Sequence, residues 1–276
     1  MAFVSQVVKK GLDSAAADFL ELASEQRLEI LSRLYEQNQK VSTVAKDIEA
    51  TVPEVFRNFE RLVKAGLISK EPDGSYSIST AGRLMCNQIS LVRFLSENKR
   101  YLKTHGFPDI SEKFLQRIVA LESGEQVKGF VKVLEKWRAI YENAETYIYN
   151  VLFEVPYTAD FIEPIAKKAS RGIRVRSVFS SSAIIPSDRK QVFEKHGFRK
   201  LIEEGRVERR MKEDVRTVVI LNEKEACVMF PASDGSPDMS EGFYSKNPRF
   251  HEWCLDYFMY CWERSGPFSE SKLKNA

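Results

Sequence analysis

The sequence has few cysteines and histidines, and it lacks the short motifs on which many enzymes depend. It contains four cysteines and three histidines in 276 residues. The cysteines form neither a Cys-x-x-Cys pair nor a spacing typical of a zinc site. There is no Walker loop, no Gly-x-Ser-x-Gly, no His-Glu-x-x-His and no Gly-x-Gly-x-x-Gly. We therefore expect reduced thiols, no catalytic residues, no metal and no cofactor, and an enzyme with a nonstandard site is the least favoured class.

Long apolar runs are scarce as well, and the charge is nearly balanced. No stretch approaches the ~20 apolar residues that a membrane span needs. Residues 1–10 lack the basic start and long apolar core of a signal peptide. The 42 Lys and Arg residues against 39 Asp and Glu give a net charge of +3, which permits an anionic partner without requiring one. We expect a cytoplasmic protein that makes no membrane contact.

What the sequence does contain is a succession of different periodicities, which predicts several domains of mixed α+β and α/β class. The pattern in residues 1–80 predicts helices followed by a hairpin, and residues 81–126 predict a helical connector or dimerisation region. Residues 127–268 predict strands alternating with helices, which is typical of an α/β output domain. Residues 269–276 are polar, so we expect a flexible, frayed tail.

Three helices are predicted before the hairpin, and the third is the best marked. It starts near Thr51 and holds Pro53 in its first turn, where a missing N–H costs nothing. Gly66 ends it as a left-handed cap. Apolar residues at spacings of four and three place one stripe against the core: Val55, Phe59 and Leu62.

The polar face of this third helix carries groups suited to DNA. A helix-turn-helix lays its second helix in the major groove, where arginine can bond guanine in two places and asparagine can do so with adenine. Arg57 and Asn58 are therefore the candidates for direct base readout. The remaining candidates on this surface are Thr51, Arg61 and Lys64 for phosphates, together with Pro53 and Glu54.

The predicted hairpin would form a wing beside this helix. Short strands at residues 67–68 and 76–78 flank Pro72-Asp73-Gly74, which is a strong turn signal. The candidates for contacts to the DNA backbone from the wing are Lys70, Ser75 and Tyr76.

The block from Val52 to Ile68, with its ending Leu62-Val63-Lys64-Ala65-Gly66-Leu67-Ile68, resembles the corresponding segment of ArsR-like and MarR-like winged-helix regulators. The hairpin and the exit Ser79-Thr80-Ala81-Gly82 match that pattern too. The resemblance implies a winged helix-turn-helix that binds double-stranded DNA.

Two alternatives stay open in this half of the chain. Residues 24–80 carry eight basic and nine acidic residues, so nonspecific DNA affinity should be modest. A winged helix that docks on transcription machinery without reading DNA is therefore the rival interpretation. The long helix predicted from Ala81 to Thr104 either pairs with its twin in a homodimer or packs on its own C-terminal domain.

The C-terminal region alternates the two kinds of element. Helices are predicted at residues 160–170, 188–203 (with a break near Gly197) and 250–263, and strands at residues 147–155, 173–179, 207–210, 217–221 and 226–230. Cys254 and Cys261 should pack on one face of the last helix.

This half, together with the connector, resembles the output domain of archaeal FilR-type methanogenesis regulators. The residues that carry the resemblance are Pro108-Asp109-Ile110, Gly172-Ile173-Arg174-Val175-Arg176 and the ending from Trp253 to Phe268. The resemblance implies a fold related to a phospholipase D half-domain, as in the sugar-responsive TrmB-type archaeal regulators. It implies sensing rather than catalysis.

Phospholipase D chemistry itself is not expected. It requires a nucleophilic histidine in a His-x-Lys pattern, and the three histidines do not provide one: His105, His196 and His251. We expect each to lie in a turn or at the surface.

A run of basic residues without an acid marks a possible effector site: Lys167, Lys168, Arg171, Arg174 and Arg176. If Ile173, Val175 and Ser177 face one side of a strand, Arg174 and Arg176 share the other. Guanidinium groups bind phosphate and carboxylate well, so a small anionic effector would suit this cluster. The alternative is a solvated edge or intramolecular ion pairs with Glu203, Glu204, Glu208 or Glu213.

These patterns together predict a sequence-specific transcription regulator that binds double-stranded DNA. We expect a homodimer whose C-terminal domain dimerises, senses a ligand, or does both.

Overall fold

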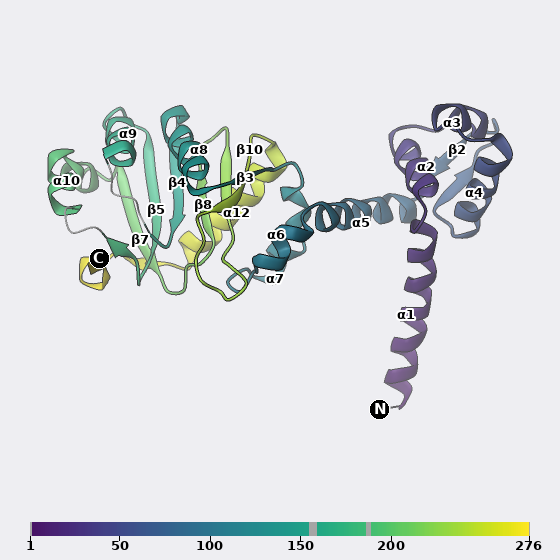
Figure 1. Ribbon diagram of the computed structural model, residues 1–276, viewed down its shortest axis with the longest axis horizontal. Coiled ribbons are helices and arrows are strands. Elements are labelled where there is room, and N and C mark those ends of the chain that lie inside the picture. The colour runs from purple at the N-terminus through teal and green to yellow at the C-terminus, as the bar shows by residue number, and fades with distance from the viewer. Residues whose placement is uncertain (1, 155–158, 186–188, 276) are drawn as a thin grey trace. The chain divides into compact units, whose positions relative to one another are not determined.

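The computed structural model describes residues 2–154, 159–185 and 189–275. It divides into two compact units, Met1–Glu97 and Asn98–Ala276, which Figure 1 shows in one ribbon. The division falls inside the region that the sequence assigned to a connector. Val155, Asp188 and Ala276, at the ends of three predicted segments, lie outside the described residues.

The first unit begins with helices α1 (Ala2–Leu22), α2 (Glu25–Glu36), α3 (Val41–Asp47) and α4 (Val52–Lys64). A hairpin of β1 (Ile68–Lys70) and β2 (Tyr76–Ile78) follows, and then helix α5 (Thr80–Glu97). The predicted succession from α2 to the hairpin is confirmed. Helix α1 precedes the three helices that the sequence predicted.

The core of this unit forms between α2, α3, α4 and the hairpin. The predicted stripe of α4 is fully buried and joins one cluster with Leu31 and Leu34 of α2. Gly66 has a φ of 71°, the left-handed value expected of a helix cap. The chain then reverses, and Leu67 N donates to Leu62 O at 3.0 Å. This cap fixes where the hairpin leaves α4.

The second unit is built on an eight-stranded sheet in the order β11-β7-β5-β4-β8-β9-β10-β3. The central strands β4 (Tyr147–Leu152), β5 (Arg174–Ser180) and β7 (Val207–Lys212) are parallel. The rest pair antiparallel: β8 (Val218–Leu221), β9 (Ala226–Met229), β10 (Glu241–Ser245), β3 (Glu125–Lys128) and β11 (Gly266–Pro267). The predicted α/β order is therefore present in a mixed sheet.

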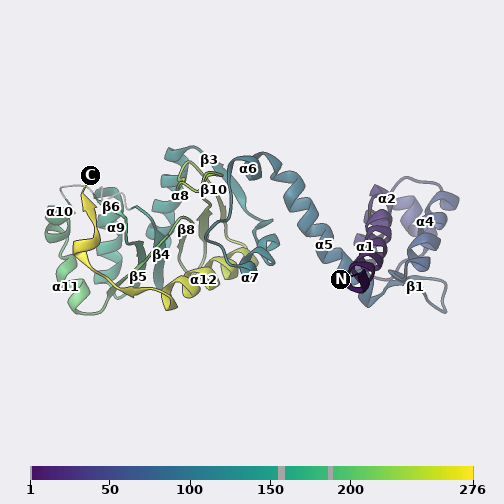
Figure 2. The ribbon, with the colours of Figure 1, turned by 90° about the horizontal axis from the view of Figure 1, so that it is seen from below.

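Helices cover both faces of the sheet, as Figure 2 shows. One face packs against α8 (Phe130–Asn143), α9 (Ala159–Ser170), α10 (Arg189–Lys195) and α11 (Phe198–Glu203). The other face packs against α12 (Pro248–Glu263), where the ring of Tyr149 stacks on Phe258 at 4.5 Å. Cys254 and Cys261 of α12 are both buried, which confirms that they share its inward face.

Several elements differ from the sequence-based expectations. The long helix expected from residue 81 to 104 is broken at Asn98, between α5 and the short α6 (Lys99–Thr104). Helix α8 and strands β3 and β10 were not predicted. The short elements before β3 are α7 (Glu112–Leu115) and a 3-10 turn at Ile118–Leu121, and β6 (Ile184–Ile185) follows β5.

The C-terminal segment, expected to be frayed, is attached to the second unit instead. It forms a 3-10 turn at Glu270–Lys272 and a short strand, β12 (Lys274–Asn275), which pairs parallel to β6. Leu273 packs against the main core. The polar character of this segment therefore did not indicate that it is frayed.

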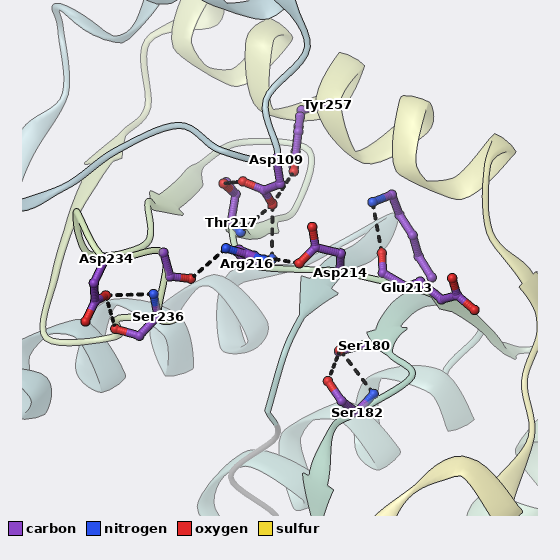
Figure 3. A network of polar contacts seen from close by, with 12 residues as sticks. Asp109, Ser180, Ser182, Glu213, Asp214, Arg216, Thr217, Asp234, Ser236 and Tyr257 are labelled. Atoms are coloured by element: carbon purple, nitrogen blue, oxygen red, sulfur yellow. Dashed lines mark hydrogen bonds and ion pairs between the residues drawn. The ribbon is translucent and has the colours of Figure 1, made fainter.

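Asp109 is one of the residues that carried the resemblance to FilR-type proteins. It connects the segment before α7 with the residues that directly precede β8. Its carboxylate accepts from Thr217 N and Thr217 Oγ1, both at 2.8 Å, and from Arg216 N at 3.0 Å. The hydroxyl of Tyr257 in α12 donates to it at 3.4 Å (Figure 3). Asp109 thus joins three segments that lie far apart in sequence.

Candidate nucleic-acid interface

Helix α4 turns most of its predicted DNA-contacting residues away from the core. Thr51, Pro53, Arg57, Arg61 and Lys64 are all exposed. Thr51 is the N-cap residue, and its side chain makes no capping hydrogen bond. The three cationic side chains Arg57, Arg61 and Lys64 therefore lie on the side of α4 opposite the buried stripe, and Thr51 lies exposed at its N-terminus.

Arg61 does not stand free on this surface, because it is paired with the end of α1. Its Nη2 and Nε lie 2.7 Å and 2.9 Å from the two carboxylate oxygens of Glu21. The hydrogen bond from Arg61 is the main cause that lowers the pKa of Glu21, with further attraction from Arg27 and Lys64. Glu21 therefore stays ionised and engages two nitrogens of the Arg61 guanidinium.

The amide of Asn58 is engaged by α2. Its Nδ2 donates to Gln26 Oε1 at 2.7 Å, and its Oδ1 accepts from Arg27 Nη1 at 3.4 Å. Gln26 Nε2 in turn donates to Glu54 Oε1 at 2.7 Å. Reading adenine would require both amide atoms of Asn58, and in this structure α2 engages both of them and the Glu54 carboxylate.

Arg27 of α2 connects the end of α1 with α4. It is only 7% exposed, and its guanidinium also donates to two carbonyl oxygens at the end of α1, Glu21 O at 2.6 Å and Leu20 O at 3.0 Å. Burial lowers the pKa of Arg27. The last turn of α1 is thereby fixed against α2 and α4, which places the Glu21 carboxylate in front of Arg61.

The hairpin contributes fewer contact residues than the sequence suggested. Lys70 is exposed, but Tyr76 is only 2% exposed and meets the ring of Phe59 edge-on at 4.7 Å. Ser75 is 7% exposed, and its hydroxyl donates to Asp73 Oδ1 at 2.7 Å. Tyr76 is a core residue because the period-two alternation of its short strand turns it inward, so neither Tyr76 nor Ser75 presents the exposed side chain that the predicted wing contact requires.

The residues of the predicted effector cluster do not form one site. Lys167, Lys168 and Arg171 line a surface pocket of ≈ 480 Å³ with four residues that the sequence did not single out: Arg138, Glu142, Glu163 and Pro164. Lys168 Nζ donates to Ala144 O at 2.6 Å. Two of the added residues are acidic, which weakens the pocket as an anion site.

Arg174 and Arg176 lie on the sheet itself, away from that pocket. The alternation of β5 buries Val175 and Ser177 on the side of α8 and α9 and turns Arg176 to the other face, where its guanidinium lies 5.0 Å from the ring of Trp262. Arg176 Nε also donates to Glu208 Oε1 at 2.8 Å. The ion-pair alternative therefore describes Arg176 correctly.

Two histidines also differ from expectation. His105 is only 6% exposed; its Nε2 lies 3.1 Å from Asp238 Oδ2 and its ring stacks on Tyr101 at 3.8 Å. His251 Nε2 lies 2.7 Å from Asn222 O. Both serve as packing and hydrogen-bonding residues within the second unit.

The sequence pattern did not reveal Glu21, Gln26 or Arg27 as part of the α4 surface. Glu21 meets Arg61 across 40 positions, and no periodicity within either helix signals such a pairing. Within the described residues, no group of histidine, cysteine and carboxylate side chains is arranged to hold a metal, and no helix there has the length and apolar character to cross a membrane.

Comparisons with known proteins give limited information. No family model matches the chain, and no curated protein matches it. The similar solved structures include TrmBL2, an archaeal chromatin protein described as showing a novel mode of DNA binding, at 15% identity over 84% of this chain and 88% of that chain, with a TM-score of 0.42. They also include the phospholipase D family member Nuc from Salmonella typhimurium, at 13% identity over 53% and 99%, with a TM-score of 0.37.

The methyltransferase RosA from Streptomyces davawensis is a third such structure, at 12% identity over 76% of this chain and 67% of that chain, with a TM-score of 0.28. Because every one of these TM-scores lies below 0.5, none of the likenesses decides the function of this chain.

Proposed function

We propose that this protein is a sequence-specific transcription regulator whose first unit is a winged helix-turn-helix that binds double-stranded DNA. In this proposal α3 and α4 form the helix-turn-helix, the β1–β2 hairpin is the wing, and the chain binds rather than catalyses. The observation that carries the proposal is the exposed side chain of Arg57, which projects from α4 on the face opposite the buried stripe of Val55, Phe59 and Leu62.

The proposal assigns two kinds of contact to the residues of this surface. Arg57 lies in the N-terminal half of α4, the part of such a helix that approaches base edges, and arginine is the side chain best suited to guanine. Thr51, Lys64 and Lys70 lie on the periphery of this surface and suit phosphates, which fix orientation without specifying sequence. Arg61 joins them once it leaves Glu21.

A homodimer is part of the proposal. Helix α5 carries an exposed apolar stripe at Leu84, Val92 and Leu95, whose exposed fractions are 62%, 52% and 41%. These residues recur at helical spacing and would pair with the same stripe of a second copy. A dimer would double the number of phosphate contacts, which compensates for the balanced charge of each first unit.

One observation favours the alternative of a protein-docking module. Val52, Phe56 and Val63 form an exposed apolar stripe along α4, with exposed fractions of 49%, 45% and 37%. Such a stripe is typical of a helix that binds protein. It lies beside the cationic surface, so a partner protein seated on it would cover part of the face proposed for DNA.

The two functions separate in a binding measurement. The full chain is titrated into a duplex from its own promoter region and into a duplex of shuffled sequence, at several salt concentrations. A regulator binds the promoter duplex at least about 10³-fold more tightly and loses affinity steeply as salt rises. Equal, weak binding to both duplexes would instead support the docking module.

A further inference from the structure

The second unit holds a pair of buried cations that the sequence did not single out. Arg189 begins α10 and Arg209 lies in β7, and their side chains are only 9% and 14% exposed. Both guanidinium groups reach Glu270. Arg189 Nη1 and Nη2 lie 2.5 Å and 3.2 Å from its two carboxylate oxygens, and Arg209 Nη1 lies 3.0 Å from one of them.

Aromatic rings hold the two guanidinium groups in place. The Cζ of Arg189 lies 4.4 Å from the centroid of the Phe193 ring, and the Cζ of Arg209 lies 4.0 Å from that of Phe268. Phe268 is itself packed against Phe179 of β5. Because a cation over a ring is attracted to it, the rings favour these orientations independently of Glu270.

The Glu270 carboxylate comes from a segment at the surface, which a ligand can displace more easily than it can displace an element of the core. Glu270 lies in the 3-10 turn of the C-terminal segment, and its side chain is 55% exposed. The segment is attached by the short β12–β6 pairing, by Leu273 and by Ser269 N near Met211 Sδ. The arginines lower the pKa of Glu270 against the opposing effect of its burial, so it occupies the site as an anion.

A hollow large enough for a metabolite opens beside the cluster. It has a volume of ≈ 570 Å³ and is lined by Ile202, Arg209, Arg210 and residues 265–268. Pockets for small molecules are commonly about 300–1,000 Å³, so a ligand could place one anionic group at the arginines and its body in a hollow.

We propose that Arg189 and Arg209 form the binding site for a small anionic ligand with a phosphate or carboxylate group, and that Glu270 is its built-in competitor. Planar guanidinium groups match the oxygens of a phosphate or a carboxylate. Because an unpaired charge is costly in a largely buried place, the two arginines need an anionic partner there. A ligand that takes the place of the Glu270 carboxylate releases residues 269–275. The proposal concerns the second unit alone, so it can fail while DNA binding by the first unit stands.

Calorimetric titration of the full chain with inorganic phosphate, and separately with citrate, tests this at fixed ionic strength. Glu270→Gln should raise the affinity for at least one anion about fivefold or more, because a competitor reduces apparent affinity by the fraction of sites it fills. Adding Arg209→Met to Glu270→Gln should abolish that binding. Glu125→Gln is the matched control: Glu125 is 63% exposed and pairs with Lys136 at 3.0 Å, and its removal should change nothing.

Hydrogen exchange gives a second readout in the unaltered chain, where saturating phosphate or citrate should accelerate exchange at residues 269–275. A response to one anion identifies which of the two chemistries the site prefers, and this supports the proposal. The proposal is overturned if folded Glu270→Gln protein binds neither anion more tightly than the unaltered chain, or if Arg209→Met leaves the binding intact.

Discussion

The guanidinium of Arg61 donates two hydrogen bonds to the carboxylate of Glu21, from Nη2 to Oε1 at 2.7 Å and from Nε to Oε2 at 2.9 Å. The carboxylate side chain is 18% exposed, whereas that of Arg61 is 50% exposed. The pair therefore lies at the surface, with the anion tucked against the protein and the cation turned to solvent. A DNA phosphate that approaches α4 must displace Glu21 or share Arg61 with it.

Replacing Glu21 should strengthen DNA binding. Glu21→Gln removes the competing charge while it keeps a hydrogen-bonding group near Arg61. Exposed ion pairs are weak, so the affinity for the promoter duplex should rise by up to about fivefold in a fluorescence anisotropy titration.

The control for that change is Glu29→Gln, which removes another exposed carboxylate of the first unit, paired with Arg33 at 3.0 Å. It should leave the affinity nearly unchanged apart from the small effect of net charge. An unchanged or weaker affinity for Glu21→Gln would show that Arg61 does not contact phosphate.

Lys64 should contribute to affinity without contributing to specificity. Lys64→Ala removes one cation from the exposed face of α4, so binding should weaken about equally for every sequence. The slope of log affinity against log salt concentration should fall by about 1. Lys132→Ala, an exposed lysine of α8 in the second unit, serves as the control, and a matching loss of slope there would remove the special role of Lys64.

Tyr76 should matter for folding and not for DNA. Its ring is buried against Phe59, so Tyr76→Ala should lower the free energy of unfolding by about 3–5 kcal/mol, as for other large aromatic side chains. Tyr76→Phe keeps the ring and should bind DNA with unchanged affinity. If Tyr76→Phe stays folded but loses affinity, the hydroxyl reaches DNA and the placement of Tyr76 in the core is incomplete.

Gly82 tests the packing between α5 and the hairpin, at Leu67 and Ile78. A Cβ at this position would lie 2.1 Å from Leu67 O and 2.8 Å from Ile78 Cγ1. Gly82→Ala should therefore lower the free energy of unfolding by about 1–3 kcal/mol, the usual cost of overpacking.

Gly11→Ala is the matched helical control, since a Cβ there meets nothing within 4 Å and alanine favours helix by about 1 kcal/mol. It should not destabilise the protein. Equal unfolding midpoints for the two variants in urea would contradict the close contact at Gly82.

Local patterns in the sequence predicted the first unit well for a physical reason. The spacing of Val55, Phe59 and Leu62 and the glycine at position 66 are properties of one helix and its cap, and both are found as expected. The direction of individual side chains near the surface was harder to predict. Asn58 has the spacing of an outward residue, yet Gln26 and Arg27 from another helix engage its amide.

The second unit shows the same limit on a larger scale. Strand β3 contains the sequence Glu-Gln-Val-Lys and is a strand because β10 pairs with it, from Glu241↔Lys128 to Tyr244↔Glu125. No alternation within four mostly polar residues predicts that pairing. The acid-free basic run was visible in the sequence, but β5 and α9 carry its members to different faces. The cations that do converge, Arg189 and Arg209, come from segments with no shared pattern.

The central claim is that Arg57 reads a base pair, and a panel of duplexes tests it most directly. The binding site is altered one base pair at a time, and the affinities of the unaltered chain and of Arg57→Ala are measured for every duplex. The account predicts that the unaltered chain discriminates at one guanine-containing pair by about 1–3 kcal/mol and that Arg57→Ala loses discrimination at that pair alone. An identical pattern of discrimination in both proteins would contradict it.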